Sequence, residues 1–255
     1  MLNAEVKRRI KSSVALRPLL AAWFGTKLAK AYFLPQALGP YVSVLRNGEL
    51  GNFTYDLTNA NLRYLAETVS VVTGKAVEEI VAYIAEVDGL PYRFGRRIGW
   101  YAIARAIKPK LIVETGIERG HGALLLSAAL KMNANDGHSG RYIGTDIDPA
   151  AGQLLTNRAF GEILYGDSIE SLRTISTPID LFINDSDHSA DYEAAEYRTI
   201  KDKLSSRAII LGDNAHVTDK LALFARETDR RFLFFAEKPK DHWYPGGGIG
   251  IAYRV

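Results

Sequence analysis

The sequence contains no cysteine. Disulfides, thiolate catalysis and cysteine-ligated metal sites are therefore excluded, and a reducing, cytoplasmic location is favoured. No apolar run approaches the roughly 20 residues that cross a bilayer as a helix, so we expect no membrane-spanning segment. A single charge sign does not dominate either, because 32 basic residues face 29 acidic ones. The net charge of +3 is too small to indicate a nucleic-acid-binding protein without a clustered basic face.

The amino-terminal segment departs from this balance. Seven lysines and arginines between residues 7 and 30 are accompanied by one acid, Glu5, and apolar residues are interleaved with them. Such a basic amphipathic segment either makes weak contact with an anionic membrane surface or packs against the rest of the protein. The sequence leaves both alternatives open.

Helical periodicity begins after this segment. Apolar residues recur at spacings of three and four over residues 62–72 and again over residues 77–87, and Gly74 and Gly89 end the two runs. A third helix is expected from about Arg96. We therefore predict an N-terminal helical region over residues 1–95 that caps a catalytic domain over residues 96–255.

Beyond residue 110, short apolar runs alternate with helical or turn segments, which is typical of a parallel sheet covered on both faces. These five runs are residues 111–113, 142–144, 163–165, 181–183 and 208–211. Two further runs, at 231–235 and 248–253, have no full helix between them, so they should pair antiparallel at the sheet edge. The predicted fold class is α/β, with seven strands.

The segment that follows the first predicted strand carries the strongest functional signal. It reads Glu114-Thr-Gly116-Ile-Glu-Arg-Gly120-His-Gly122 and leads into an apolar, helix-prone stretch. Gly116 and Gly120 let bare backbone approach a nucleotide while helix-terminal N–H groups face it. The spacing differs from the dinucleotide fingerprint, and Glu114 would repel a phosphate. A carboxylate suits an amino group and a sulfonium, which predicts S-adenosylmethionine as the ligand.

The five parallel strands all end in polar residues, at the edge where open parallel sheets bind ligands. Asp146, at the end of the second strand, is placed to bind ribose hydroxyls, and Asp167 and Ser168 could reach an adenine edge. Asp185 and Asp213 follow the fourth and fifth strands. The alternative is that several of these residues only cap the helices that follow them.

Taken together, the motif at 114–120, Asp146, residues 166–168, the run Asp185-Ser-Asp-His-Ser189 and the pair Asp213-Asn214 resemble a class I S-adenosylmethionine-dependent methyltransferase. The resemblance covers roughly residues 100–255. It is strongest for the cation-dependent O-methyltransferases of the catechol, caffeoyl-coenzyme A and macrolide sugar types. It implies a Rossmann-like seven-stranded sheet, mostly parallel with the last strand antiparallel.

The resemblance also implies roles for individual residues. Glu114 and Gly116, with Gly120, would hold the methionine part of the donor, Asp146 the ribose, and Asp167 and Ser168 the adenine, with Asp185 also against the donor. Asp185, Asp213 and Asn214 would bind a divalent cation, and His188 would act as general base.

Some physical chemistry supports the cation. Neighbouring parallel strands lie about 4.8 Å apart, so Asp185 and Asp213 could share one ion. Hard oxygen ligands favour Mg²⁺, with Mn²⁺ or Ca²⁺ as alternatives, and the ion would lower the pKa of the acceptor hydroxyl. His188 could take the proton, since imidazole is a common general base. Alternatively, the acids cap helices and methylation is independent of metal.

The acceptor is expected to be a small hydroxylated molecule, namely a sugar, a polyketide glycoside or a phenol. The loop at residues 242–248 could fold over it with Trp243 or Tyr244, and His216 is a second candidate beside it. Two other functions remain open: a metal-independent methyltransferase of another acceptor class at a membrane surface, and a non-catalytic S-adenosylmethionine-binding protein. Assembly into a homo-oligomer is also left open.

Overall fold

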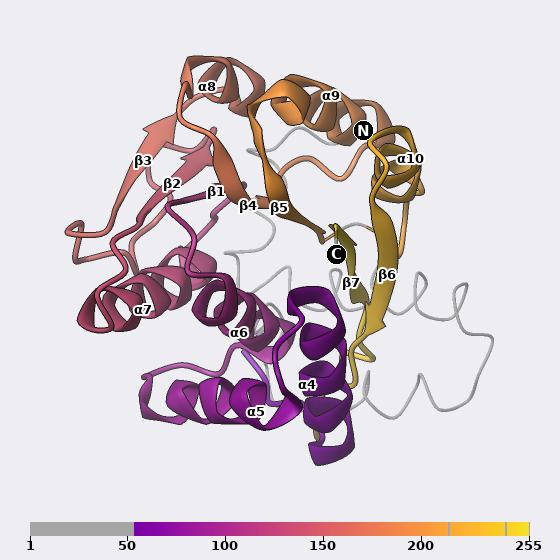
Figure 1. Ribbon diagram of the computed structural model, residues 1–255. Helices are drawn as coiled ribbons and strands as arrows, with labels where there is room; N and C mark the ends of the chain where they lie inside the picture. Colours follow the sequence, from indigo (N-terminus) through magenta and orange to yellow (C-terminus); the bar gives the residue numbers. More distant parts are fainter. Residues whose placement is uncertain (1–53, 214, 243, 255) are drawn as a thin grey trace, which may run out of the picture.

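The computed structural model describes residues 54–213, 215–242 and 244–254. The basic segment, Asn214 and Trp243 therefore lie outside the described residues. A seven-stranded sheet with the strand order β3-β2-β1-β4-β5-β7-β6 forms the centre of the molecule (Figure 1). The strands are β1 (Leu111–Thr115), β2 (Arg141–Asp146), β3 (Gly161–Tyr165), β4 (Ile179–Asn184), β5 (Leu204–Gly212), β6 (Arg231–Ala236) and β7 (Gly248–Tyr253).

The strand directions confirm the predicted fold class. Strands β1 to β5 pair in parallel, whereas β7 is antiparallel to both of its neighbours, β5 and β6. Because the parallel strands run the same way, their carboxyl ends meet at one edge of the sheet. Every candidate residue at a strand end therefore lies along that edge.

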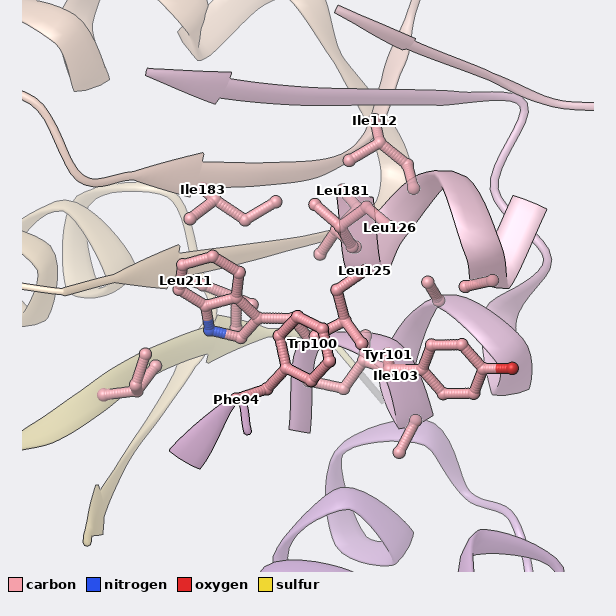
Figure 2. Close-up of a cluster of buried hydrophobic side chains, with 14 of the residues drawn as sticks. Phe94, Trp100, Tyr101, Ile103, Ile112, Leu125, Leu126, Leu181, Ile183 and Leu211 are labelled. Carbon is pink, nitrogen blue, oxygen red and sulfur yellow. The ribbon is translucent and has the colours of Figure 1, made fainter. Parts of the chain in front are cut away.

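Helices cover both faces of the sheet (Figure 1). One face carries α6 (Ile98–Ile107) and α7 (His121–Asn135), and the other carries α8 (Ser168–Thr174), α9 (Ala190–Ile200) and α10 (Lys220–Glu227). The strands alternate accordingly: Ile209 and Leu211 of β5 pack toward the first face, and Ile210 packs toward the second. Figure 2 shows Trp100 near Ile183 and Leu211, and Leu125 near Leu181, in the core between the sheet and α6 and α7.

Two further helices, α4 (Asn59–Thr73) and α5 (Val77–Ala85), pack beyond α6. The side chain of Thr58 caps the start of α4, and Gly74 ends it with a φ of 70°, at the predicted position. The second predicted helix is shorter than expected, because its last turn is the 3-10 turn η3 (Glu86–Gly89). The third predicted helix begins with another such turn, η4 (Gly95–Arg97).

A polar cluster joins these helices. Glu86 accepts hydrogen bonds from Tyr101 (2.7 Å) and from Nε of Arg105 (2.8 Å), both on α6.

The division of the chain into an N-terminal helical region and a catalytic domain at residue 95 stays a prediction. Within the described ranges, no helix is both long and apolar enough to cross a membrane.

Candidate functional site

The turn after β1 has the geometry that its glycines suggested. Gly116 and Gly120 have φ values of 77° and 93°, in the left-handed region that favours glycine. The N–H of Gly116 donates to the carbonyl of Thr145 (2.9 Å), which ties the turn to β2. A side chain at position 116 would strike the backbone of Asp185 and Ser186. The turn can therefore approach the end of β4 only because residue 116 is a glycine.

Asp146 holds this turn from the end of β2. Its Oδ2 accepts the N–H of Glu118 (2.8 Å) and its Oδ1 accepts the N–H of Asp148 (2.9 Å). Each oxygen retains a lone pair, so the carboxylate can still accept hydrogen bonds from a ligand. The structure thus brings Asp146 and the glycine turn together as predicted from the sequence.

Glu114 is buried beneath the first turn of α7, with 1% of its surface exposed. The hydroxyl of Tyr142 donates to its Oε2 (2.7 Å), and a side chain at position 122 would strike its carboxylate. Burial raises the pKa of Glu114 to about 7, against the lowering effects of the Tyr142 bond and of Arg97. This carboxyl group therefore titrates near neutral pH.

A second buried carboxylate, that of Glu196 on α9, was not foreseen. It accepts hydrogen bonds from four side chains at the carboxyl edge of the sheet: Thr115 (3.0 Å), Ser186 (2.8 Å), Ser168 and Asn184. Burial raises its pKa even though the four bonds oppose that effect. Glu196 therefore joins the ends of β1 and β4 to the start of α8. Asn184, a polar residue directly after the apolar run Leu181 to Ile183, was the signal in the sequence.

The residues assigned to adenine are also engaged. The Asp167 side chain caps α8 through the N–H of Glu170 (3.1 Å) and accepts the hydroxyl of Tyr192 (2.9 Å). Ser168 is 5% exposed, and its oxygen lies 2.9 Å from that of Tyr192. Capping is thus one real role of Asp167, as the alternative interpretation held, and adenine binding stays a prediction.

Two arginines lie against the acids at the ends of β4 and β5. Arg96 donates through Nε (2.8 Å) and Nη2 (2.6 Å) to the same oxygen, Oδ1 of Asp213. Arg97 donates through Nη2 to Oδ2 of Asp185 (3.3 Å). All four side chains are at least four-fifths buried. No local pattern indicated these pairs, because Asp185 follows Arg97 by 88 positions and Asp213 follows Arg96 by 117.

The charges of this cluster are strongly coupled. Burial raises the pKa of Asp185 well above its usual range, and the nearby Asp213 adds to the rise. Burial acts the same way on Asp213, but Arg96 and Arg97 outweigh it and hold the pKa of Asp213 below its usual value. Asp213 is therefore the ionised partner and Asp185 the one that retains a proton more readily.

A third acid completes the surroundings of Arg96. Its Nη1 donates to the hydroxyl of Tyr55 (3.0 Å) and to Oε1 of Glu237 (3.1 Å). Tyr55 donates in turn to Oε2 of Glu237 (2.6 Å), and the N–H of Gly247 donates to Oε1 (2.9 Å). The ring of Tyr244 lies 5.8 Å from that of Tyr55. Residues before α4 and after β6 thus build this side of the site together.

The proposed cation does not fit these donors. The described residues contain no group of three or more His, Cys, Asp or Glu side chains placed to hold a metal ion. More importantly, Oδ1 of Asp213 already accepts two N–H groups from a permanently charged guanidinium. The assignment of Mg²⁺ to Asp185 and Asp213 is therefore not supported, and the third predicted ligand, Asn214, lies outside the described residues.

Three histidines lie on segments that border the site. His188, the predicted base, is exposed on the loop between β4 and α9. His216 is also exposed, and its Nδ1 lies 3.1 Å from the carbonyl oxygen of Asp213. His121, at the start of α7, has a buried Nε2 without a partner among the described residues, and burial lowers its pKa to about 4. His121 is therefore neutral at physiological pH.

Residues 113–215 match a family model described as a methyltransferase domain. The match covers less than half of the chain, and it supports the predicted methyltransferase family and enzyme class. The matched range of the methyltransferase domain contains Asp146, Asp185, Glu196 and Asp213, but it excludes the arginines of η4 and Glu237.

Solved structures with likeness to the chain include several methyltransferases. One from Geobacter sulfurreducens is 18% identical, with 69% of this chain and 90% of that chain covered and a TM-score of 0.48. The O-methyltransferase TomG from Streptomyces achromogenes, involved in tomaymycin synthesis, is 14% identical (71% and 91% covered, TM-score 0.48). The SAH-bound methyltransferase PaMTH1 from Podospora anserina is 18% identical (87% and 97% covered, TM-score 0.48). Likeness at this level establishes neither donor nor acceptor. No curated protein matches the chain significantly.

Proposed function

We propose that the protein transfers the methyl group of S-adenosylmethionine to an oxygen atom of a small hydroxylated acceptor, such as a sugar, a polyketide glycoside or a phenol. The observation that carries the proposal is the position of the glycine turn within the methyltransferase domain. Gly116 packs against the backbone of Asp185, and Asp146 holds the turn from the other side. Such a corner, at the carboxyl edge of a parallel sheet, is a nucleotide-binding arrangement.

The donor would lie across this corner. Asp146 would accept the ribose hydroxyls through its remaining lone pairs, and Asp167 and Ser168 would border the adenine. Gly116 and Gly120 would border the methionine part, with the Glu114 carboxylate behind them. Methyl transfer then needs chiefly an in-line approach of the acceptor oxygen to the methyl group.

The acceptor would lie beside Asp185, toward the arginines and Tyr244. His188 or Asp185 would take the proton of the acceptor hydroxyl, since the loop that carries both leaves the end of β4. The proposed reaction uses no metal ion, because Arg96 and Arg97 already pair with the acids. This pairing favours a metal-independent reaction over the cation-assisted one that the sequence pattern suggested.

Calorimetric titration of the protein with S-adenosylmethionine, and separately with NAD, tests the donor. We expect saturable binding of the methyl donor and none of NAD. Binding of NAD without the methyl donor would refute the proposal. Release of labelled methyl groups to a panel of sugars and phenols then tests the acceptor class, and donor binding with no transfer to any oxygen acceptor would point to the non-catalytic alternative.

A further inference from the structure

We infer that Arg96 and Arg97 take the place of a divalent cation in this site, so that Asp185 and Asp213 bind no Mg²⁺ or Mn²⁺ in the native protein. The inference rests on the proposed function only in treating these strand ends as the reaction site. It concerns a property of the chain that metal titration measures directly.

The two acids are placed as a cation site would require. The parallel register sets Asn184 of β4 beside Gly212 of β5, and the N–H of Asp213 donates to the carbonyl of Asn184 (2.9 Å). Asp185 and Asp213, each one residue further on, therefore leave the sheet side by side. Their side chains are only 10% and 7% exposed, and a buried pair of acids requires a positive partner.

The arginines already supply that positive charge. Two N–H groups of Arg96 converge on one oxygen of Asp213 at 2.6 and 2.8 Å, whereas Mg²⁺ needs oxygens at about 2.0–2.1 Å in near-octahedral arrangement. Arg97 pairs with Asp185 through one longer bond, from Nη2 to Oδ2 (3.3 Å). Two guanidinium groups carry the same formal charge as one divalent ion and cannot lose it by deprotonation. An additional ion at this oxygen would meet a fixed cation in a nearly dry environment.

Arg96 cannot easily swing away to admit a metal. Its Nη1 is held by Tyr55 and Glu237, and the Glu237 side chain is fully buried. The turn that carries it is also fixed: Gly95 has a φ of 53°, its N–H donates to the carbonyl of Tyr55 (2.8 Å), and a side chain there would strike the Tyr55 ring. The guanidinium therefore approaches Asp213 from a rigid support.

Arg97 is the member of the pair that faces a ligand. The guanidinium of Arg97 stacks over the ring of Trp100 at 5.2 Å, and its Nε is buried without a partner among the described residues. Nε2 of His121 is likewise buried without a partner among them. Buried donors without partners are rare and indicate a ligand or water that completes them. A reacting oxygen would thus meet guanidinium N–H groups in the place where related chemistry uses a metal.

The test is a titration of the full chain with Mn²⁺, followed by the electron paramagnetic resonance signal of free Mn²⁺. For the wild type we expect no saturable site below about 1 mM, and methyl transfer unchanged by EDTA. Wild-type binding of one equivalent of Mn²⁺ that Asp213→Asn abolishes would overturn the inference, as would activity that EDTA removes and Mg²⁺ restores. This first experiment does not depend on whether an arginine variant folds.

The second arm creates the missing site. Arg96→Met leaves Asp213 without its partner, so we expect Mn²⁺ to bind at least tenfold more tightly than to the wild type, and Arg96→Met/Asp213→Asn to lose that gain. Arg93→Met is the matched control, because Arg93 pairs with Asp56 on the exposed surface (3.1 Å) and its loss should change nothing. A folded Arg96→Met protein that binds no Mn²⁺ would refute the inference that Arg96 takes the place of the cation. Titration with S-adenosylmethionine reports separately on the proposed function, which can fail while the metal result stands.

Discussion

Replacing Glu196 by alanine should destabilise the protein and weaken donor binding together. The carboxylate is fully buried and accepts four side-chain hydrogen bonds, from Thr115, Ser168, Asn184 and Ser186. A net loss of about 1 kcal/mol for each bond gives roughly 4 kcal/mol, less a relief of about 1 kcal/mol because the carboxylate no longer has to be buried. At 2–4 °C per kcal/mol for a chain of this length, the unfolding midpoint should fall by roughly 10 °C.

The assay is thermal unfolding followed by circular dichroism, with calorimetric titration of S-adenosylmethionine on the same samples. Glu193→Ala is the matched control: Glu193 lies on the same helix, is equally buried and, among the described residues, accepts two side-chain bonds, from Tyr197 (2.8 Å) and Thr218. It should cost about half as much and leave donor affinity unchanged, because its partners lie away from the glycine turn. A smaller loss for Glu196→Ala than for Glu193→Ala would refute the reasoning.

Three further predictions concern the donor corner. Gly116→Ala should lower the affinity for S-adenosylmethionine at least tenfold, because a side chain there strikes the backbone at the end of β4. Gly137 has a similar φ of 85° but open space around it, so Gly137→Ala should cost only about 1 kcal/mol of stability and leave the affinity unchanged. Equal calorimetric dissociation constants of the two variants for S-adenosylmethionine would contradict this. Asp146→Asn should also lower the affinity for S-adenosylmethionine in that titration. Asp180→Asn is its control and should leave the affinity unchanged, because the Asp180 carboxylate accepts two backbone N–H groups at the opposite edge of the sheet. Because burial raises the pKa of Glu114 from 4.5 to about 7, its stabilising contribution is complete below pH 4.5 and is lost as the pH rises through 7, by about 3 kcal/mol. Glu114→Gln should therefore gain stability relative to the wild type between pH 5 and pH 8.5, and an unfolding-midpoint difference that does not vary with pH would exclude this.

The sheet was predictable from local patterns. Each apolar run became a strand, and the missing helix between residues 235 and 248 correctly indicated an antiparallel pair. The extent of the helices was harder to read. The apolar spacing of residues 77–87 continues smoothly, but the chain tightens into a 3-10 turn at Glu86, where that side chain is held by Tyr101 and Arg105. A tertiary contact of this kind leaves no trace in the local sequence.

The same distinction separates the two halves of the site. The proposed donor corner, the glycine turn after β1 with Asp146, is built from residues close in sequence to a strand end. Glycine spacing and the acids at strand ends were therefore sufficient to predict the turn at Gly116 and its nearness to Asp146. The other half depends on pairs that are far apart in the chain, such as Arg96 with Asp213. An aspartate that pairs with an arginine and an aspartate that binds a metal look the same in the sequence. The metal prediction was not supported for that reason.

The long-range bonds around Arg96 also govern when the site can exist. Arg96 and Glu237 are separated by 141 positions, which at about 5–20 residues per second takes the ribosome roughly 7–28 s to synthesise. Arg97 lacks Asp185 for the first 88 positions of synthesis after it, Arg96 lacks Asp213 for 117, and Arg96 lacks Glu237 throughout the interval, although the glycine turn and β2 are made early in it. The donor corner can therefore form on a nascent chain well before the acceptor side, which is assembled only when β6 and Glu237 have left the ribosome.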